Sequence, residues 1–248
     1  MNDAIVSAIS GAIDRLGCRR QILKRWGVPG YVPTYNEDGL FTNHNCDFIR
    51  DEKFRAAYDK GFSTGSTQDW HIRWRIHLML WAAATVKSLP GDFIECGTYL
   101  GASASAIIDY TDFGRLGKSF FLCDTFTGLP AHAEVGHDYK KKDYYDDVAG
   151  TFSSFPSVKL VKGLIPESLK SVHLSSLSLV HIDCGMLEAE APALRYLWDY
   201  IVKGGIVILN YYAYPGFTHI KNEYDKFSRE RDVPIFSCPT RQGLIVKE

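Results

Sequence analysis

In 248 residues the chain carries 28 basic and 29 acidic side chains, for a net charge of −1, which argues against a broad nucleic-acid or membrane-surface footprint. The length suits one α/β domain with an extension, and no apolar run approaches the roughly 18 residues that cross a bilayer. The six cysteines are scattered singly and the N-terminus carries Asp3 and Asp14 without a basic leader, so we expect a reduced, cytoplasmic protein.

The first part of the chain, residues 1–65, predicts a helical N-terminal extension. Apolar residues recur at helical spacing over residues 3–26, which indicates an amphipathic helix. Residues 30–47 are loop-like, and Asp47 is the expected N-cap of a helix that runs through Lys60. We expect this extension to shape an acceptor pocket or to form the contact of a homodimer.

Strand and helix patterns alternate over residues 66–248, as in a wound α/β sheet. After a helix over residues 69–89, the expected strands are 93–96, 119–123, 158–161, 177–182 and 206–209. The expected helices between and after them are 101–110, 144–155, 166–172, 189–201 (closed by Lys203-Gly204-Gly205) and 216–230. A hairpin-like strand pair, 234–238 and 243–247, follows. The order predicts a mostly parallel seven-stranded sheet with an antiparallel last strand.

The first of these strands ends in an acid and a tight glycine turn, formed by Glu95, Gly97 and Gly101. Glycines let the backbone approach a ligand, and the following helix offers unpaired N–H groups. The Gly-x-x-x-Gly spacing differs from the Gly-x-Gly-x-x-Gly of dinucleotide sites, which disfavours a nucleotide-dependent dehydrogenase. An acid without the pyrophosphate pattern suits a cationic, phosphate-free nucleoside, and S-adenosylmethionine fits that description.

In an open parallel sheet the ligand lies beyond the carboxyl ends of the strands. The residues that follow the five expected strands are Glu95, Asp124, Gly163, Asp183 and Asn210. Asp124 lies about 20 residues after the glycine turn, the separation at which an acid accepts from ribose hydroxyls. The alternative for Asp124 is a loop carboxylate or a helix cap. The alternative for Glu95 is a buried structural acid, in place of a partner for the donor's cation.

Four stretches of this region are similar to the macrocin O-methyltransferase family. They are GDFIECG at residues 91–97, FLCDTFTGLP at 121–130, HIDC at 181–184 and KGGIVIL at 203–209. The resemblance covers about residues 64–248, and the second stretch is more specific than the glycine turn. It implies a Rossmann-like class I methyltransferase fold and a metal-assisted enzyme that transfers a methyl group from S-adenosylmethionine to sugar hydroxyls of natural products.

This resemblance also implies roles for individual positions. The residues that would contact the donor are Glu95, Gly97, Tyr99, Gly101, Ser103, Asp124, Thr125, Phe126 and Gly163. The first five would line the methionine and ribose end, Asp124 to Phe126 would hold ribose and adenine, and Gly163 would lie near the base. In the helix before the first strand, either Arg73 or Arg75 could reach the donor carboxylate, and we favour Arg73.

The sequence departs from the family at the metal-ligand positions. Where the family has Asp-x-Asp and Asp-Asp-Tyr, this chain has Asp183-Cys184-Gly185 and Asn210-Tyr211-Tyr212. Asp183 and Asn210 thus occupy the first two ligand positions, with Tyr211 at the third. Because Mg²⁺ prefers several oxygen ligands including carboxylates, a magnesium site of the family type is doubtful. Three alternatives follow. The enzyme works without a metal, it recruits another metal ligand, or the protein still binds the donor but no longer transfers the methyl group.

Histidine is the expected general base, because its unperturbed pKa suits removal of a hydroxyl proton. His137 stands in the polar loop after the second strand, at the family's candidate base position, and His132 in the same loop fits a surface residue equally well. His219 could replace a lost carboxylate near Asp183, whereas His181, inside a strand, reads as a core residue.

We therefore expect an O-methyltransferase that acts on a small-molecule acceptor, a sugar or sugar-bearing natural product, with S-adenosylmethionine as cofactor and His137, Asp183 and His219 as catalytic candidates. The alternative is a methyltransferase-like protein that binds the donor but has lost catalysis with the metal site. A different reaction in the same pocket has no specific support in the sequence.

Overall fold

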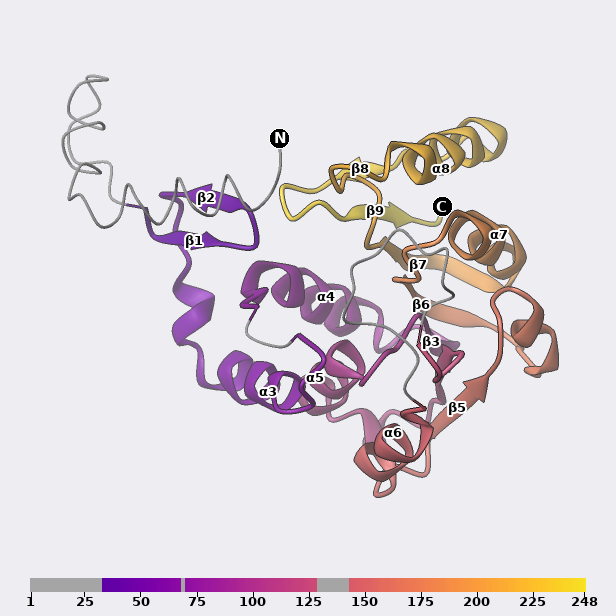
Figure 1. Cartoon of the computed structure of the whole chain (residues 1–248), viewed down its shortest axis with the longest axis horizontal. Coiled ribbons are helices and arrows are strands. Elements are labelled where there is room, and N and C mark those ends of the chain that lie inside the picture. Colours follow the sequence, from indigo (N-terminus) through magenta and orange to yellow (C-terminus); the bar gives the residue numbers. More distant parts are fainter. Residues whose placement is uncertain (1–32, 68–69, 129–142) are drawn as a thin grey trace. The chain divides into compact units, whose positions relative to one another are not determined.

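The computed structural model of the chain describes residues 33–67, 70–128 and 143–248 (Figure 1). The helix expected over residues 3–26, and the two histidines His132 and His137, lie outside these described residues. The chain divides into two compact units, Met1–Cys46 and Asp47–Glu248.

The described part of the first unit is a small β-hairpin, formed by β1 (Tyr35–Glu37) and β2 (Leu40–Thr42). The two-residue turn, Asp38-Gly39, has positive φ values of 50° and 70° at its residues. Asp-Gly is a preferred sequence for turns of this kind, because glycine adopts positive φ without strain. The expectation of a loop over residues 30–47 is wrong for this segment.

The second unit is built on one sheet. Its described strands are β3 (Asp92–Cys96), β4 (Phe120–Asp124), β5 (Val158–Lys162), β6 (Leu177–Ile182), β7 (Ile201–Leu209), β8 (Phe236–Ser237) and β9 (Gly243–Val246). They form a seven-stranded sheet in the order β5-β4-β3-β6-β7-β9-β8. The neighbours from β5 to β7 are parallel, whereas β9 is antiparallel to both β7 and β8. The expected mixed sheet with an antiparallel last strand is confirmed.

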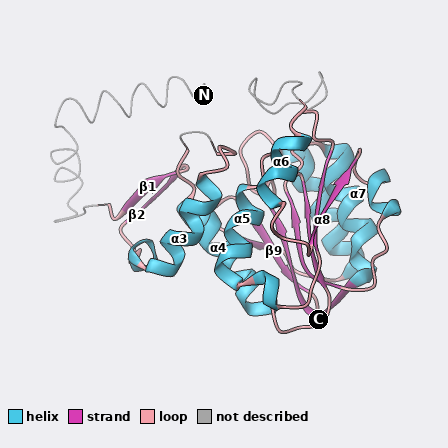
Figure 2. Ribbon diagram, turned by 90° about the horizontal axis from the view of Figure 1, so that it is seen from below, coloured by secondary structure: helices cyan, strands magenta, loops and turns pink. Residues whose placement is uncertain are grey.

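Helices cover both faces of the sheet (Figure 2). The described α-helices of this unit are α3 (Glu52–Phe62), α4 (Arg73–Val86), α5 (Ala102–Thr111), α6 (Tyr145–Phe152), α7 (Leu187–Leu197) and α8 (Thr218–Arg231). One apolar core joins α3, α4, α5 and α6 to the sheet, and a second joins α7 and α8 to the opposite face. Every residue of the central strand β6 is buried, as the two-sided cover requires. No helix in the described ranges is long and apolar enough to cross a membrane.

The second unit and its first helix begin at other residues than the sequence predicts. The sequence places the domain boundary after residue 65, whereas α3 belongs to the same compact unit as the sheet. Asp47 begins a 3-10 turn, Asp47–Arg50, and is not the N-cap of α3. The cap is Asp51, whose side chain accepts from the N–H of Phe54 at 2.8 Å.

The sequence predicts that the glycine pair Gly204-Gly205 closes the preceding helix. This prediction is wrong, because both glycines lie inside β7. Helix α7 ends earlier, and β7 begins at Ile201. The register between β6 and β7 shifts between Leu177 and Leu179, so the extra residues of β7 form an irregularity there. Glycine suits it because a Cβ at Gly205 would lie 2.7 Å from the side chain of Ile201.

Gly97 permits a close approach between two strand ends. Its φ is 89°, and a Cβ built on it would overlap the main-chain carbonyl of Asp183. Gly117 also has positive φ, 65°, but has open space where its Cβ would be. The two positions therefore separate backbone strain from steric overlap.

We expect Gly97→Ala to lower the free energy of unfolding by at least about 2 kcal/mol more than Gly117→Ala, because only the first combines left-handed strain with overlap on a carbonyl. Urea unfolding of the ligand-free protein, followed by circular dichroism, measures both. Equal losses in the two variants would show that the strand ends separate at no cost.

Candidate functional site

Main-chain hydrogen bonds extend the sheet one residue beyond the strand ends. They hold Gly97 against β4, Asp183 against β3 and Asn210 against β6, at N···O distances of 2.8, 2.7 and 2.9 Å. Gly163 is held against β4 in the same way, at 2.9 Å. The structure therefore gathers the positions that follow the strands at one edge of the sheet, as the sequence predicts.

Side chains alternate between the two faces of a strand. Phe93, Leu179 and Ile208 belong to the core under α4 and α5. By the same alternation Glu95, Asp124, Asp183 and Asn210 all point to that face, and we call these four residues the strand-end site. Polar groups from four adjacent strands thus meet beside α4 and α5.

Asp124 is held by hydrogen bonds from its own chain. Its Oδ1 accepts from the N–H of Phe126 at 2.9 Å and from the hydroxyl of Tyr144 at 2.8 Å, and its Oδ2 accepts from the N–H of Tyr99 at 2.8 Å. Tyr99 and Phe126 both have positive φ, 49° and 54°, which turns these N–H groups toward the carboxylate. Since a carboxylate oxygen can accept two bonds, Oδ2 keeps capacity for a ligand hydroxyl.

Tyr144 is a site residue that the sequence analysis missed. Burial, together with the neighbouring Asp124, raises the pKa of the Tyr144 hydroxyl well above its usual value, so the phenol stays protonated and donates. Its ring also contacts those of Tyr99 and Phe126, with centroids 5.3 and 6.1 Å apart. Tyr144 lies about 20 residues from Asp124, beyond the reach of local sequence patterns.

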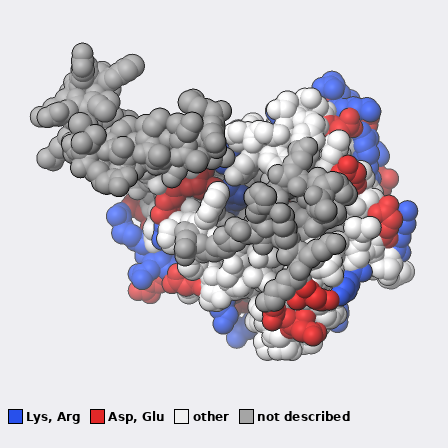
Figure 3. Space-filling model, viewed as in Figure 1, with Lys and Arg blue, Asp and Glu red and all other residues white. Residues whose placement is uncertain are grey.

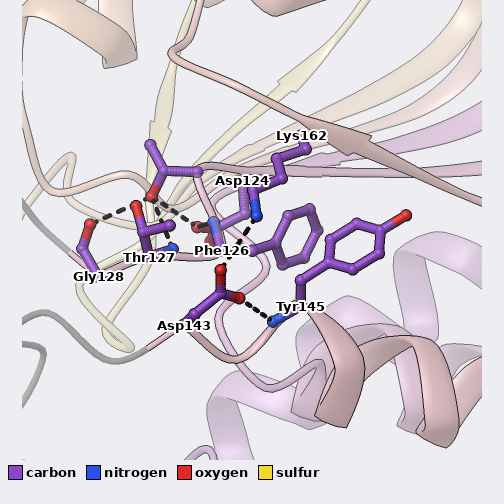
Figure 4. Close-up of polar contacts among 8 residues, drawn as sticks. Asp124, Phe126, Thr127, Gly128, Asp143, Tyr145 and Lys162 are labelled. Atoms are coloured by element: carbon purple, nitrogen blue, oxygen red, sulfur yellow. Dashed lines mark hydrogen bonds and ion pairs between the residues drawn. The ribbon is translucent and has the colours of Figure 1, made fainter.

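The turn after β4 is shown in Figure 4. Thr125 Oγ1 donates to the carbonyl of Gly128 at 3.1 Å, and Lys162 pairs with Asp143 at 3.3 Å. The Phe126 ring is fully buried, so the expected contact of Phe126 with adenine would involve its backbone rather than its ring. Gly163 lies beside this turn through its bond to β4.

Glu95 pairs with His181 under the strand-end site. His181 Nδ1 lies 2.9 Å from Glu95 Oε1, and both side chains are 2% exposed. Burial raises the pKa of Glu95, although the hydrogen bond to His181 opposes this. Burial lowers the pKa of His181, but the bond to Glu95 and its charge outweigh it, so that pKa is raised. Glu95 Oε2 and His181 Nε2 have no hydrogen-bond partner among the described residues.

The glycine turn leads into α5 without a capping side chain. Gly101 is the N-cap in the left-handed conformation, with φ of 85°, and no side chain of the described residues caps the helix. Ser103 is half-buried in this first turn. The free N–H groups and the spare oxygens of Glu95 and Asp124 fit a nucleoside that carries hydroxyls and a cation.

Asp183 is the start of a buried hydrogen-bonded chain. Asn210 Nδ2 donates to Asp183 Oδ1 at 2.6 Å, Gln242 Nε2 donates to Asn210 Oδ1 at 3.3 Å, and Thr240 donates to Gln242 Oε1 at 2.9 Å. Because β9 is antiparallel, the residues just before it lie at the edge where β7 ends. Gln242 and Thr240 were missed by the sequence analysis, since only the sheet brings them to Asn210.

This chain of bonds does not fit a magnesium site of the family type. Asn210 presents an N–H donor to Asp183, and its amide oxygen already accepts from Gln242. Mg²⁺ would need Asn210 to release its amide oxygen from Gln242 and turn it toward the ion. The described residues also contain no group of three or more His, Cys, Asp or Glu side chains arranged to hold a metal ion.

The two arginines at the start of α4 point to different partners. The Arg73 guanidinium lies 5.3 Å from the Tyr58 ring centroid. Burial raises the pKa of Asp183, and charges that lower it include that of Arg75, which is therefore near the strand-end site. Arg75 also lies 5.9 Å from the ring of Tyr214. The role of Arg73 at the donor carboxylate stays a prediction.

Of the histidines favoured as bases, His219 alone lies in the described ranges. It is half-buried in the first turn of α8, with its ring 6.1 Å from that of Phe217. Its role, like that of His137, stays a prediction.

Glu190 organises the loop between β6 and α7. Its Oε1 accepts from the N–H groups of Cys184 and Gly185, both at 2.7 Å, and its Oε2 accepts from Tyr224. Burial raises the pKa of Glu190 to about 7, although these hydrogen bonds oppose the shift. The side chain thus fixes the backbone directly after Asp183.

A family model described as Macrocin-O-methyltransferase (TylF) matches residues 73–236, well over half of the chain. The chain belongs to the macrocin-O-methyltransferase family. It is therefore an S-adenosylmethionine-dependent methyltransferase, as the motifs predicted. A sequence comparison with curated proteins found no match.

Solved structures of O-methyltransferases share the fold. The structure of NovP aligns with a TM-score of 0.60 and 16% identity, over 75% of this chain and 88% of NovP. The calicheamicin methyltransferase CalS11 aligns with a TM-score of 0.56 and 14% identity, over 87% and 98%. The methyltransferase PaMTH1 of Podospora anserina, solved with bound S-adenosylhomocysteine, gives 0.56 and 16%, over 80% and 88%. These likenesses confirm the Rossmann-like class I fold of this macrocin-O-methyltransferase family member.

We expect Glu190→Gln to flatten the pH dependence of stability. Because the pKa of Glu190 is raised in the folded state, its contribution favours folding at low pH and is lost as pH rises from about 4.5 to about 7. At about 1.4 kcal/mol per pKa unit, the wild type should lose up to about 3 kcal/mol over this range that the variant does not.

Urea unfolding at several pH values measures the difference. Glu188→Gln, an exposed change on the same helix, is the matched control and should follow the wild type. Parallel curves for Glu190→Gln and the wild type would contradict the expected ionisation of Glu190.

Proposed function

We propose that this methyltransferase moves the methyl group of S-adenosylmethionine to a hydroxyl of a small molecule, a sugar or sugar-bearing natural product, without a magnesium ion. The observation that carries the proposal is the strand-end site: carboxylates and an amide from four neighbouring strands on one face, beside an uncapped helix N-terminus. The family's description and the fold support hydroxyl methylation.

The donor would bind across the ends of β3 and β4. Asp124 Oδ2 has room to accept from ribose hydroxyls, and the buried Oε2 of Glu95 offers negative charge to the donor's cationic end. The glycine turn lets the backbone come close to both. When bound, the donor supplies an activated methyl group and leaves as a neutral thioether.

Asp183 is our candidate base within the described residues. Its Oδ1 is held by Asn210, and its Oδ2 accepts no hydrogen bond from a described residue. Burial raises the pKa of the Asp183 carboxyl, so its ionised form is a better proton acceptor than an exposed carboxylate. Oδ2 would take the hydroxyl proton as the acceptor oxygen forms its bond to the methyl carbon. His137 and His219 stay proposed as alternative bases.

The acceptor would lie over β6 and β7, beside Asp183. In the segment that follows β7, the rings of Tyr211, Tyr214 and Phe217 contact one another, with centroids 4.6 to 5.7 Å apart. Tyr211 and Phe217 also pack on the core under α7 and α8, whereas Tyr214 lies near Arg75. Such flat faces suit sugar rings. One structurally similar protein, CalS11, is described as a TDP-rhamnose 3′-O-methyltransferase, which supports a sugar hydroxyl as the acceptor group.

We expect S-adenosylhomocysteine to bind the wild type and Asp124→Asn to weaken its binding at least about tenfold, since a hydrogen bond to a charged group contributes about 1.5–3 kcal/mol. The asparagine amide would also face the N–H donors that hold Asp124. Isothermal titration calorimetry measures both affinities, and Asp112→Asn, at the exposed end of α5, is the matched control.

Failure of the wild type to bind S-adenosylhomocysteine would overturn the proposed donor site. Binding without transfer of labelled methyl groups to any sugar-bearing acceptor, in the presence or absence of magnesium, would instead establish the non-catalytic alternative.

Asn210→Asp should create a dependence on magnesium that the wild type lacks. It would place a second carboxylate against Asp183, which destabilises the protein by about 2 kcal/mol, or a Tm lower by about 5 °C, unless a cation binds between them. Millimolar Mg²⁺ should restore the Tm of this variant and leave the wild type unchanged.

Thermal unfolding with Mg²⁺ or with a chelator is the measurement, and Asn222→Asp on the exposed surface of α8 is the control. A rise in the wild-type Tm with Mg²⁺ that the control shares would count against metal independence.

A further inference from the structure

The turn before β9 places an arginine beside the acceptor side of the strand-end site. Arg241 lies in the turn between β8 and β9, and its carbonyl accepts from the N–H of Ala213 at 2.9 Å. Its own N–H donates to the carbonyl of Cys238 at 3.0 Å. These bonds fasten the turn to the segment that follows β7, so Arg241 belongs to the same edge as Asn210.

Arg241 occupies a backbone conformation that disfavours its residue type. Its φ is 69°, in the left-handed region where glycine or asparagine is less strained. The next residue, Gln242, is fully buried and bonded to Asn210, so the turn is tied to the strand-end site. A strained arginine in a fixed turn suggests a use for its side chain.

Two guanidinium groups approach one aromatic ring at this edge. The Arg241 guanidinium carbon lies 4.6 Å from the centroid of the Tyr214 ring, and that of Arg75 lies 5.9 Å from the same centroid. Both arginines and the tyrosine are half-buried. Stacking on the ring holds a guanidinium in place while its N–H groups remain able to bind an anion.

The acidic neighbours of the two guanidinium groups differ. Arg75 is close enough to Asp183 for its charge to act on that carboxyl. Within residues 33–67, 70–128 and 143–248, no carboxylate pairs with Arg241. On the face drawn in Figure 3, basic and acidic side chains are interspersed around the rim of the described surface. The half-buried Arg241 guanidinium therefore has N–H groups that an anion can bind.

We propose that Arg241, with Arg75 and the Tyr214 ring, binds an anionic group, a phosphate or a carboxylate, carried by the acceptor. The inference rests on the proposed function and adds a charge to the acceptor class. The position favours acceptor over donor: Arg241 is at the end of β7 and β9, at least two strands from the glycine turn after β3, or about 10 Å. Donor and anion thus occupy different parts of the edge.

The test uses the full chain loaded with S-adenosylhomocysteine, titrated with inorganic pyrophosphate and, separately, with malonate by isothermal titration calorimetry. We expect the wild type to bind at least one of these probes, and the tighter one identifies the class of anion. Arg241→Gln should weaken that binding at least about tenfold, and Arg241→Lys less. Arg229→Gln, an exposed change of the same charge on α8, should leave it unchanged.

A second pair of titrations separates this site from the donor site. S-adenosylhomocysteine carries a carboxylate that 5′-methylthioadenosine lacks. If Arg241→Gln weakens only S-adenosylhomocysteine, the arginine binds the donor and the proposal is overturned. It is also overturned if the loaded wild type binds neither probe, or if Arg241→Gln and Arg229→Gln behave alike. Failure of S-adenosylhomocysteine itself to bind would overturn the proposed function instead.

Discussion

The contact between Gly97 and the main chain of Asp183 determines how closely the ends of β3 and β6 approach. A side chain at position 97 would occupy the place of the Asp183 carbonyl, so the two ends converge only because residue 97 is glycine. This approach puts Asp183 next to the glycine turn and leaves Glu95 paired with His181 directly below. Methyl transfer requires donor and acceptor to meet within reacting distance, and in the proposed mechanism they meet at this convergence.

Around that point the site is built from two kinds of support. Asp124 is held by local bonds from Tyr99 and Phe126, whose left-handed backbone aims their N–H groups at it. Asp183 is held by a chain of side chains from distant segments, through Asn210 and Gln242. The first arrangement leaves oxygen capacity for hydroxyls, whereas the second occupies the amide oxygen of Asn210 that a magnesium ion would require.

The sequence predicts the frame of this molecule well, because the frame depends on local and periodic signals. Apolar strand runs, glycine turns and the acids that end β3, β4 and β6 are visible without a structure, and the parallel order then gathers them. The predicted boundaries of helices and strands were wrong where one residue type occurs in two kinds of local structure. Gly204-Gly205 reads as a helix stop but serves as an irregularity in β7, and Asp51 rather than Asp47 caps α3.

The partners of the site residues were beyond prediction for a different reason. Tyr144, Glu190 and Gln242 carry no motif, and each reaches its partner only through tertiary contacts. The choice between Arg73 and Arg75 could not be made from the sequence for the same reason. Which of the two side chains faces the site depends on how α4 packs on the sheet. His137 lies outside the described residues, and its role stays a prediction.

The position of β9 has a consequence for how the site would lose order. The β8–β9 hairpin lies at the edge of the sheet and reaches the site through Arg241 and Gln242. Edge segments open at lower free energy than the centre of a sheet. Fraying of this hairpin would release Asn210 and let Asp183 reorient, while the bonds around Asp124, at the end of β4, persist. On heating, the proposed catalytic activity would then be lost at a lower temperature than the affinity for the donor.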